Sequence, residues 1–376
     1  MKFASGILFT AVVSLMALGM VALVSASTGQ ELPRQLMMHP FWCAIGLVTC
    51  GVVAWRDYRW LSHISLLGLG VSVILLALVF VPPFGDRTHG SSRWLDFGSV
   101  RMQPSEFAKL ALILVLAHYG AYYQPHMKTF RKGVFIPMAL MAPVIGLVFL
   151  EPDVGASTLL TIVGAVMLVV AGAKVRYLAT PAVLTTIALA FFLWHNPNRS
   201  ARIYSWLNLE ETRHGMGMQV YNSIMAMGQG GVEGVGLGAG EIKLNYIPEN
   251  HNDFIFSVIG EELGLVATLG VVLGYLAIVL AGLYIAWHAR ETFGMLLATG
   301  ITTLIGLQAI INIGVVTGTI PNKGLALPFI SYGGSNMVSL MIGIGLLLNV
   351  ARHGKPRRKR DELPLPQNEI LSYQYL

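Results

Sequence analysis

Long runs of apolar residues, separated by short polar segments, recur along the whole chain. A hydrocarbon core of about 30 Å requires roughly 20 mostly apolar residues in a helix. The windows that meet this requirement lie near residues 7–27, 38–55, 61–82, 104–123, 133–150, 156–173, 177–194, 253–287, 292–318 and 329–351. The pattern therefore predicts an all-α polytopic membrane protein with ten transmembrane helices. We expect one membrane domain over residues 1–351 and a basic tail at 352–376.

Basic residues are unevenly distributed over the segments between these spans. If the amino terminus is inside, the inner segments hold most of the Lys and Arg, and both termini are predicted to be cytoplasmic. The inner set is Lys2, Arg56, Arg59, Lys128, Arg131, Lys132, Lys174, Arg176, Arg290, Arg352, Lys355, Arg357, Arg358, Lys359 and Arg360. A basic tail beside a last span is more typical of an anchor on anionic lipid than of a nucleic-acid site, so we expect no nucleic-acid partner.

Composition supports the membrane class and excludes several others. Apolar residues make up 55% of the chain and charged residues 12%. Cys43 and Cys50 lie about two turns apart on one predicted helix, roughly 10 Å, which is too far for a disulfide. The first apolar run is longer than a signal-peptide core and favours a retained span. The glycine-dense stretch Gly228–Gly240 has Glu233 where a dinucleotide fingerprint needs glycine, so it predicts no such site.

One long extracytoplasmic loop, residues 195–252, is predicted between the seventh and eighth spans. Within it, Val220, Ile224 and Met227 fall on one helical face, which indicates a helix resting on the outer membrane interface. A flexible connector is the alternative. A loop of this length in a compact bundle is more often functional or disordered, and its aromatic and Met content argues against disorder.

Four clusters of polar and special-backbone residues come out on the outer side when the spans are counted. They are Gln103–Glu106 with Lys109, Glu151–Asp153, Pro248–Asp253 and Ser331–Ser335. Because they share one side of the membrane, we expect them to form one site.

The first cluster places two opposite charges three residues apart near the outer start of the fourth span. Charges within a span are expensive and are normally paired or turned toward a cavity. Glu106 and Lys109 could form an ion pair that only holds the bundle. Alternatively, Lys109, or a nearby Arg such as Arg93 or Arg101, meets an anionic substrate group while Glu106 orients it.

Carboxylates dominate the second and third clusters. Asp153, in a short outer turn, could simply cap the sixth span, and Asp253 or Asn252 could cap the eighth. Asp253 is the better candidate for chemistry because Glu249, His251 and Asn252 crowd the same entrance, where a partly desolvated acid can become a general base. Glu261 and Glu262, about two turns deeper, are interpreted as counter-ions of Lys109.

The fourth cluster opens the last span after a turn that contains Lys323. Gly333, Gly334 and Ser335 would leave backbone N–H groups exposed at a helix amino terminus, where the helix dipole favours an anion. Lys323 adds a positive charge. A phosphate or pyrophosphate at the outer surface fits this pattern.

Four strings carry a family resemblance, and they occur in the same order among the ten spans. They are RWLDFGSVRMQPSEFAK (93–109), EPDVGAS (151–157), IPENHNDFIFSVIGEELG (247–264) and KGLALPFISYGGSN (323–336). Over roughly residues 7–351 the chain resembles the SEDS family, and within it FtsW and SpoVE more than RodA. The chain departs from many members at Glu151, where Gln is common, and at Asn252, where Thr is common.

The resemblance implies a peptidoglycan glycosyltransferase that polymerises lipid II outside the bacterial cytoplasmic membrane, at the septum if its duty is division. It places the essential aspartate on Asp253 and further motif positions on Glu106, Lys109, Asp153 and Ser335. It also implies a cognate class B penicillin-binding protein and other divisome or elongasome proteins as partners. The leaving pyrophosphate needs positive charge, and basic residues, the last helix's amino end or a divalent ion such as Mg²⁺ or Mn²⁺ could supply it.

Two other function classes compete with this interpretation. A lipid II flippase would need a hydrophilic path through the whole bilayer, whereas the charges here gather in the outer half and leave the inner half nearly free of charge. A passive scaffold would leave the outer carboxylates unexplained. We therefore favour the polymerase.

Overall fold

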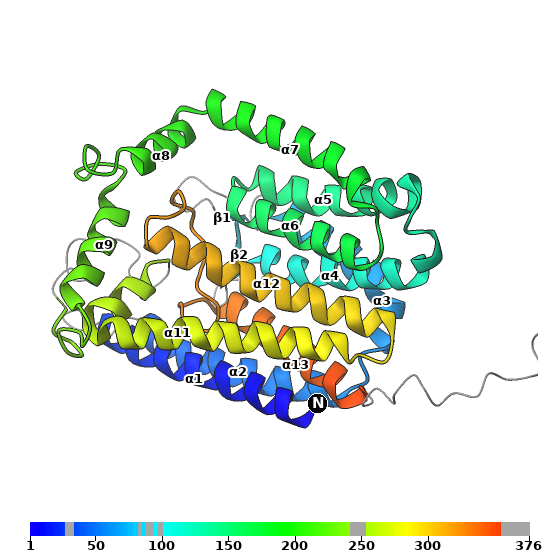
Figure 1. Cartoon of the computed structure of the whole chain (residues 1–376), viewed down its shortest axis with the longest axis horizontal. Helices are drawn as coiled ribbons and strands as arrows, with labels where there is room; N and C mark the ends of the chain where they lie inside the picture. The colour runs from blue at the N-terminus through cyan, green and yellow to red at the C-terminus, as the bar shows by residue number, and fades with distance from the viewer. Residues whose placement is uncertain (27–33, 82–84, 87–92, 97–100, 241–252, 355–376) are drawn as a thin grey trace, which may run out of the picture.

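The computed structural model describes residues 1–26, 34–81, 85–86, 93–96, 101–240 and 253–354. Helices form most of these residues (Figure 1). A helix coincides with each predicted span, so the predicted helical class is confirmed. These helices are α1 (Lys2–Ala26), α2 (Arg34–Trp55), α3 (Trp60–Leu78), α4 (Pro104–Tyr122), α5 (Ile136–Leu150), α6 (Val154–Val170), α7 (Val175–His195), α11 (Ile255–Trp287), α12 (Thr292–Val316) and α13 (Gly334–His353).

Length and composition separate these helices into two groups. Within the described ranges, eight helices are long and apolar enough to cross a membrane, one of them when α5 is extended by the π-helical turn Arg131–Phe135 (η3). The other two are α6, with 17 residues, and α4, whose first turns carry Glu106 and Lys109. The chain is thus a multi-pass membrane protein, and the full set of ten crossings stays a prediction.

The bundle is built from pairs of helices that run along each other. α1 packs on α11, α2 on α13, α3 on α4, and α12 contacts α4, α6, α11 and α13 (Figure 1). A Cβ at Gly354, just after α13, would lie 2.5 Å from Cε of Met1, so the start of α1 and the end of α13 share one end of the bundle. This is the end expected to be cytoplasmic.

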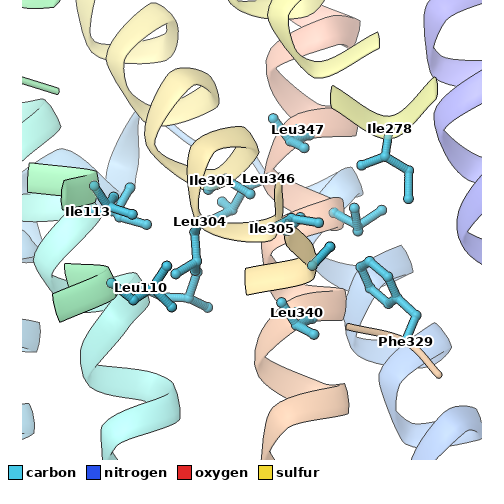
Figure 2. Close-up of a cluster of buried hydrophobic side chains, with 14 of the residues drawn as sticks. Leu110, Ile113, Ile278, Ile301, Leu304, Ile305, Phe329, Leu340, Leu346 and Leu347 are labelled. Carbon is cyan, nitrogen blue, oxygen red and sulfur yellow. The ribbon is translucent and has the colours of Figure 1, made fainter. Parts of the chain in front are cut away.

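The centre of the bundle is filled by apolar side chains from five segments. Figure 2 shows the side chains that we call the apolar plug: Leu110, Ile113, Ile278, Ile301, Leu304, Ile305, Phe329, Leu340, Leu346 and Leu347. All of them are buried. Because close packing leaves no room for water between such side chains, the plug closes the middle of the bundle.

Helix α7 stands apart from the rest of the bundle (Figure 1). Aromatic pairs connect its two ends to neighbours, Phe130 with Tyr177 and Phe149 with Phe192. Along its length Val183, Leu184 and Ile187 are exposed. Side chains of this kind are what a lipid-facing span presents to hydrocarbon.

A small antiparallel sheet, absent from the sequence prediction, precedes α4. Its strands β1 (Gly85–Asp86), β2 (Trp94–Asp96) and β3 (Arg101–Met102) lie in the order β1-β2-β3. Leu95 of β2 pairs with Met102 and is fully buried. Arg101 pairs with Asp96 across the sheet, and Arg101 Nε lies 3.1 Å from Asp96 Oδ2. The sheet fixes the position of Arg93, the residue before β2.

The segment between α7 and α11 is helical where the structure describes it. It contains α8 (Pro197–Leu207) and α9 (Met218–Gly230). Of the α9 face predicted to rest on the membrane interface, Val220 is buried and Met227 packs against the core, whereas Ile224 is exposed. Ser223 Oγ also donates to the carbonyl of Val316 at the end of α12. Helix α9 thus packs mainly on α11 and touches the outer end of α12.

The glycine-dense stretch packs against a kink in α11 at Gly264, where φ is +70°. Backbone N–H groups of Val235 and Gly236 donate to the carbonyls of Glu261 and Glu262. A Cβ at Gly234 would lie 2.1 Å from the Glu262 carbonyl oxygen. Glycine is therefore needed here for close backbone contact, and the predicted eighth span consists of two helical segments.

An irregular segment, residues 317–333, connects α12 to α13. The last span thus begins at Gly334, later than the predicted residue 329. Phe329 and Ile330 are buried, and a Cβ at Gly19 of α1 would lie 2.7 Å from the Ile330 backbone. Non-helical backbone at this depth is tolerated only where protein groups satisfy it. Tyr275 donates to the Pro328 carbonyl, and Ser331 Oγ accepts from the Leu327 N–H.

Candidate functional site

Asp253 lies two residues before the first residue of α11, Ile255. The N-cap position is held by Phe254, which makes no side-chain capping hydrogen bond, so Asp253 stands one residue before the cap; Asn252, the other predicted cap, lies outside the described residues. The backbone carbonyl of Asp253 accepts from Asn312 Nδ2 of α12 at 2.8 Å. A Cβ at Gly324 would lie 2.7 Å from Asp253 Oδ2, so this carboxylate rests against a backbone that carries no side chain.

Two further charged residues of the predicted site, Lys323 and Asp153, interact with each other near Asp253. Lys323 directly precedes Gly324 and is half-buried. Burial lowers the pKa of the Lys323 ammonium from its ordinary value, and the negative charge of Asp153 acts in the opposite direction. Asp153 Oδ1 accepts from the Ala156 N–H at 2.9 Å, so Asp153 is the N-cap of α6. Its position is therefore fixed by the helix that it caps.

Arg93 is engaged by the turn that holds Asp153. Its guanidinium donates to the backbone carbonyls of Glu151 (3.2 Å) and Pro152 (3.1 Å), and Nη1 lies 3.8 Å from Asp153 Oδ2. Burial raises the pKa of the Glu151 carboxyl to about 8, the charge of Asp153 adds to the rise, and Arg93 opposes it. The Arg93 guanidinium is thus bound by the groups of this turn.

Glu106 and Lys109 form a buried ion pair on α4, with Lys109 Nζ 2.8 Å from Glu106 Oε2. Lys109 Nζ also lies 3.4 Å from Gln308 Oε1 of α12. These are its polar partners in the described part of the chain, so the interpretation of Glu261 and Glu262 as its counter-ions is wrong. Glu262 instead accepts from Ser25 Oγ of α1. The carboxylate of Glu261 lies against Gly240 of the glycine-dense stretch, where an added Cβ would be 2.8 Å from Oε2. Both acids therefore face other partners than Lys109.

The glycines of the fourth cluster open α13, as predicted. Gly333 is the N-cap and Gly334 the first helical residue. Ser335 Oγ accepts from the backbone N–H of Gln103, which connects this helix start to the start of α4. A Cβ at Gly334 would lie 2.5 Å from Cε2 of Trp42, so α2 covers one side of it.

The structure therefore gathers most of the predicted residues at one end of the bundle. Contacts connect the start of α4 to the start of α13, and Asp253 to the segment that holds Lys323. Two candidates, Glu249 and His251, lie outside the described residues together with Asn250 and Asn252.

Two residues missed from the sequence organise the site from α12. Gln308 and Asn312 are each 1% exposed and lie one turn apart. Gln308 Nε2 donates to the Ala326 carbonyl at 2.9 Å, and Asn312 Nδ2 donates to that of Leu325 at 2.6 Å. Two amides at i and i+4 inside an otherwise apolar span were the available signal, because buried amides need partners.

Metal ligands do not cluster in the part of the chain that the structure describes. No group of three or more His, Cys, Asp and Glu side chains there is arranged to hold an ion. Cys43 and Cys50 are both free, as their spacing predicted, and both are buried.

Fold and site together define a class, a multi-pass α-helical membrane protein with buried acids and bases at one end of its bundle. Comparison with known families agrees with the motifs. A family model described as a cell cycle protein, covering FtsW, RodA and SpoVE, matches residues 6–356. The chain belongs to this FtsW/RodA/SpoVE family.

Curated relatives refine the comparison. A probable peptidoglycan glycosyltransferase FtsW of Geobacter metallireducens is 39% identical over 354 residues, which cover 91% of this chain and 93% of the relative. The stage V sporulation protein E of Bacillus subtilis is 35% identical over 323 residues, 86% of this chain and 87% of that protein. The similarity thus extends over nearly the whole chain.

Solved structures show the same architecture. A chain from a peptidoglycan synthase complex, described as coordinating polymerization and crosslinking, has a TM-score of 0.76 and 27% identity, and covers 92% of this chain and 96% of its own. The rod shape determining protein RodA of Thermus thermophilus has a TM-score of 0.70 and 27% identity, with 93% and 97% covered.

Proposed function

We propose that this chain is a peptidoglycan glycosyltransferase that polymerises lipid II at the outer face of the cytoplasmic membrane. Family membership and relatives named as glycosyltransferases support the activity. The observation that carries the proposal is Asp253, whose backbone is fixed by Asn312 and whose carboxylate rests on Gly324 beside Lys323. A fixed carboxylate next to a cation suits a base facing an anionic leaving group.

The reaction joins an acceptor hydroxyl to a lipid-linked donor. The 4-hydroxyl oxygen of the acceptor's terminal GlcNAc bonds to C1 of the donor's MurNAc with inversion. The bond from C1 to the pyrophosphate oxygen breaks, and undecaprenyl pyrophosphate leaves with the electron pair. Asp253 takes or orients the hydroxyl proton.

Substrate binding is assigned to the groups around this carboxylate. Lys323 and the N–H groups at Gly333, Gly334 and Ser335 would meet the pyrophosphate, while Asp153, Glu249 and His251 would bind polar parts of the substrate. Lys109, oriented by Glu106, is the deeper cation of the site. A divalent ion remains a further source of positive charge for the leaving group.

The apolar plug argues against a flippase. Its residues Ile113, Leu304 and Leu340, labelled in Figure 2, are each four residues, about one helical turn, from Lys109, Gln308 and Asn336, on the side expected to be cytoplasmic. A lipid-linked sugar crossing the bilayer would need polar groups where these side chains pack. Polar chemistry at the outer end alone fits a polymerase.

Location and partners follow the same proposal. We expect both termini in the cytoplasm and the site outside, with the protein acting at the division septum. A chain of a peptidoglycan synthase complex has the same fold, which supports a complex with a cognate class B penicillin-binding protein and other divisome proteins.

The test uses the purified chain, with and without its class B partner, and labelled lipid II. Glycan on a gel is expected for wild type. Asp253→Asn keeps size and hydrogen bonding but removes the proton acceptor, so it is expected to abolish polymer while its unfolding temperature stays near wild type. A polymer yield near wild type from Asp253→Asn would contradict the assignment of Asp253 as the base.

A further inference from the structure

Glu151, in the turn between α5 and α6, is a fully buried acid next to the candidate site. It is 0% exposed, and neither oxygen of its carboxyl group has a hydrogen-bond partner among the residues that the structure describes. Arg93, whose charge acts on Glu151, uses its guanidinium on the backbone carbonyls of Glu151 and Pro152 and on the carboxylate of Asp153. An ionised carboxylate in this setting would be buried without a donor, which is strongly unfavourable.

The charged groups around Glu151 favour its protonated, neutral form. Asp153, in the same turn, disfavours a second negative charge, and Arg93, before β2, is the one described base that acts directly on Glu151. Lys323, from the segment after α12, interacts with Asp153. Arg199, from α8, lies over the rings of Phe149 and Phe192 and is repelled by the like charge of Arg93. Of these cations, Arg93 and Lys323 are thus matched to Asp153, and Arg199 is held over aromatic rings.

We propose that Glu151 is a positioning residue that acts as a neutral carboxylic acid and so leaves Arg93 on the turn and on Asp153. When Glu151 loses its proton, its carboxylate competes for the Arg93 guanidinium, which must then leave Asp153 or the carbonyls. Through Asp153 the change reaches the substrate side of the turn. The effect on catalysis rests on the proposed polymerase activity, whereas the protonation state of Glu151 does not.

Stability should report the same proton. The pKa of Glu151 in the folded protein, about 8, is raised above its ordinary value of 4.5, so between these pH values the folded state holds a proton that the unfolded state lacks. Stability therefore falls as pH rises through this window, and the favourable contribution of the neutral form is lost as pH passes about 8. Glutamine, the neutral isostere, has no proton to lose.

The experiment compares wild type with Glu151→Gln, Glu151→Ala and the control Glu233→Gln, which changes an exposed glutamate. In difference infrared spectra across pH 8, the band of a protonated carboxylic acid is expected in wild type and the control and absent from Glu151→Gln. As pH rises, the unfolding temperature of wild type is expected to fall relative to that of Glu151→Gln.

Polymerisation of labelled lipid II gives the functional readout. The rate of Glu151→Gln relative to wild type is expected to rise about tenfold between about pH 7 and about pH 9, the factor by which the protonated fraction changes for a pKa near 8. Glu151→Ala should be slower at every pH. A flat rate ratio, or a Glu151→Ala rate equal to that of Glu151→Gln, would overturn the positioning role, and a missing infrared band would overturn the neutral acid. Absence of glycan from wild type at any pH would instead contradict the proposed function.

Discussion

At the residue scale, the position of the Asp253 carboxylate depends on a missing side chain. Gly324 has open space except toward Asp253, whose Oδ2 would lie 2.7 Å from an added Cβ. Burial and backbone geometry do not otherwise require glycine there, because the residue is exposed and its φ is not in the left-handed region. Glycine at position 324 therefore leaves the space that the Asp253 carboxylate occupies.

Gly324→Ala should move Asp253 without unfolding the protein. The methyl group needs the space of Oδ2, so the carboxylate must rotate or shift by several tenths of an ångström or more. Misplacing a catalytic group by about 1 Å can cost about 10²-fold in rate, and we expect a loss approaching that size. The measurement is polymer formation from labelled lipid II, together with the unfolding temperature.

Gly228→Ala is the matched control, because a Cβ at Gly228 meets nothing within 4 Å. It should polymerise at the wild-type rate. Full activity in Gly324→Ala would show that the reaction does not depend on the present position of the Asp253 carboxylate.

The residue scale also shows where sequence reasoning reached its limit. The spacing of Glu106 and Lys109 predicted that they face each other, and the structure shows their ion pair at 2.8 Å. The spacing could not reveal that Gln308, about two hundred positions later, completes the surroundings of Lys109. Contacts between distant segments depend on how the helices pack, which no local pattern encodes.

At the element scale, α12 holds the irregular segment that carries the outer site. Gln308 and Asn312 donate to the carbonyls of Ala326 and Leu325, and Asn312 also reaches Asp253. One face of one helix therefore fixes both the loop before α13 and the start of α11. The alignment of Asp253 with Lys323 depends on this face.

Asn312→Leu should release both attachments at once. Leucine has the same branching of side-chain heavy atoms as asparagine but leaves the two carbonyls without this donor, at a cost of about 1–3 kcal/mol for each unsatisfied buried group. We expect a lower unfolding temperature and a clear loss of polymerisation. Thr317→Val at the C-cap of α12 is the control, since among the described residues the hydroxyl of Thr317 bonds to residues 313, 314 and 319 and not to Asp253 or Leu325. Equal stability of the two variants would contradict the role given to Asn312.

Elements differed in how well the sequence predicted them. A span such as α12 follows directly from a run of apolar residues long enough to cross hydrocarbon. The three-stranded sheet before α4 was missed because its strands contain only two or three residues each. The packing of α9 on protein was missed because one apolar face fits a membrane interface and a neighbouring helix equally well.

At the scale of the whole molecule, the described candidate site residues lie at one end of the bundle. The apolar plug closes the middle of the bundle, and Met1 and Gly354 meet at the other end. Basic residues at that other end predict that it is cytoplasmic. The central claim is therefore that the polar end faces outward and receives the lipid-linked substrate there.

The most direct measurement places a single cysteine at Asn322, beside Lys323, in a background with Cys43 and Cys50 replaced by serine. Asn322 is part-buried and donates to Gln219 of α9. A membrane-impermeant thiol reagent is applied to intact cells, and then to proteoliposomes with and without lipid II. The account predicts labelling without permeabilisation and slower labelling when lipid II is present. Labelling that requires permeabilisation, or a rate that lipid II does not change, would contradict it.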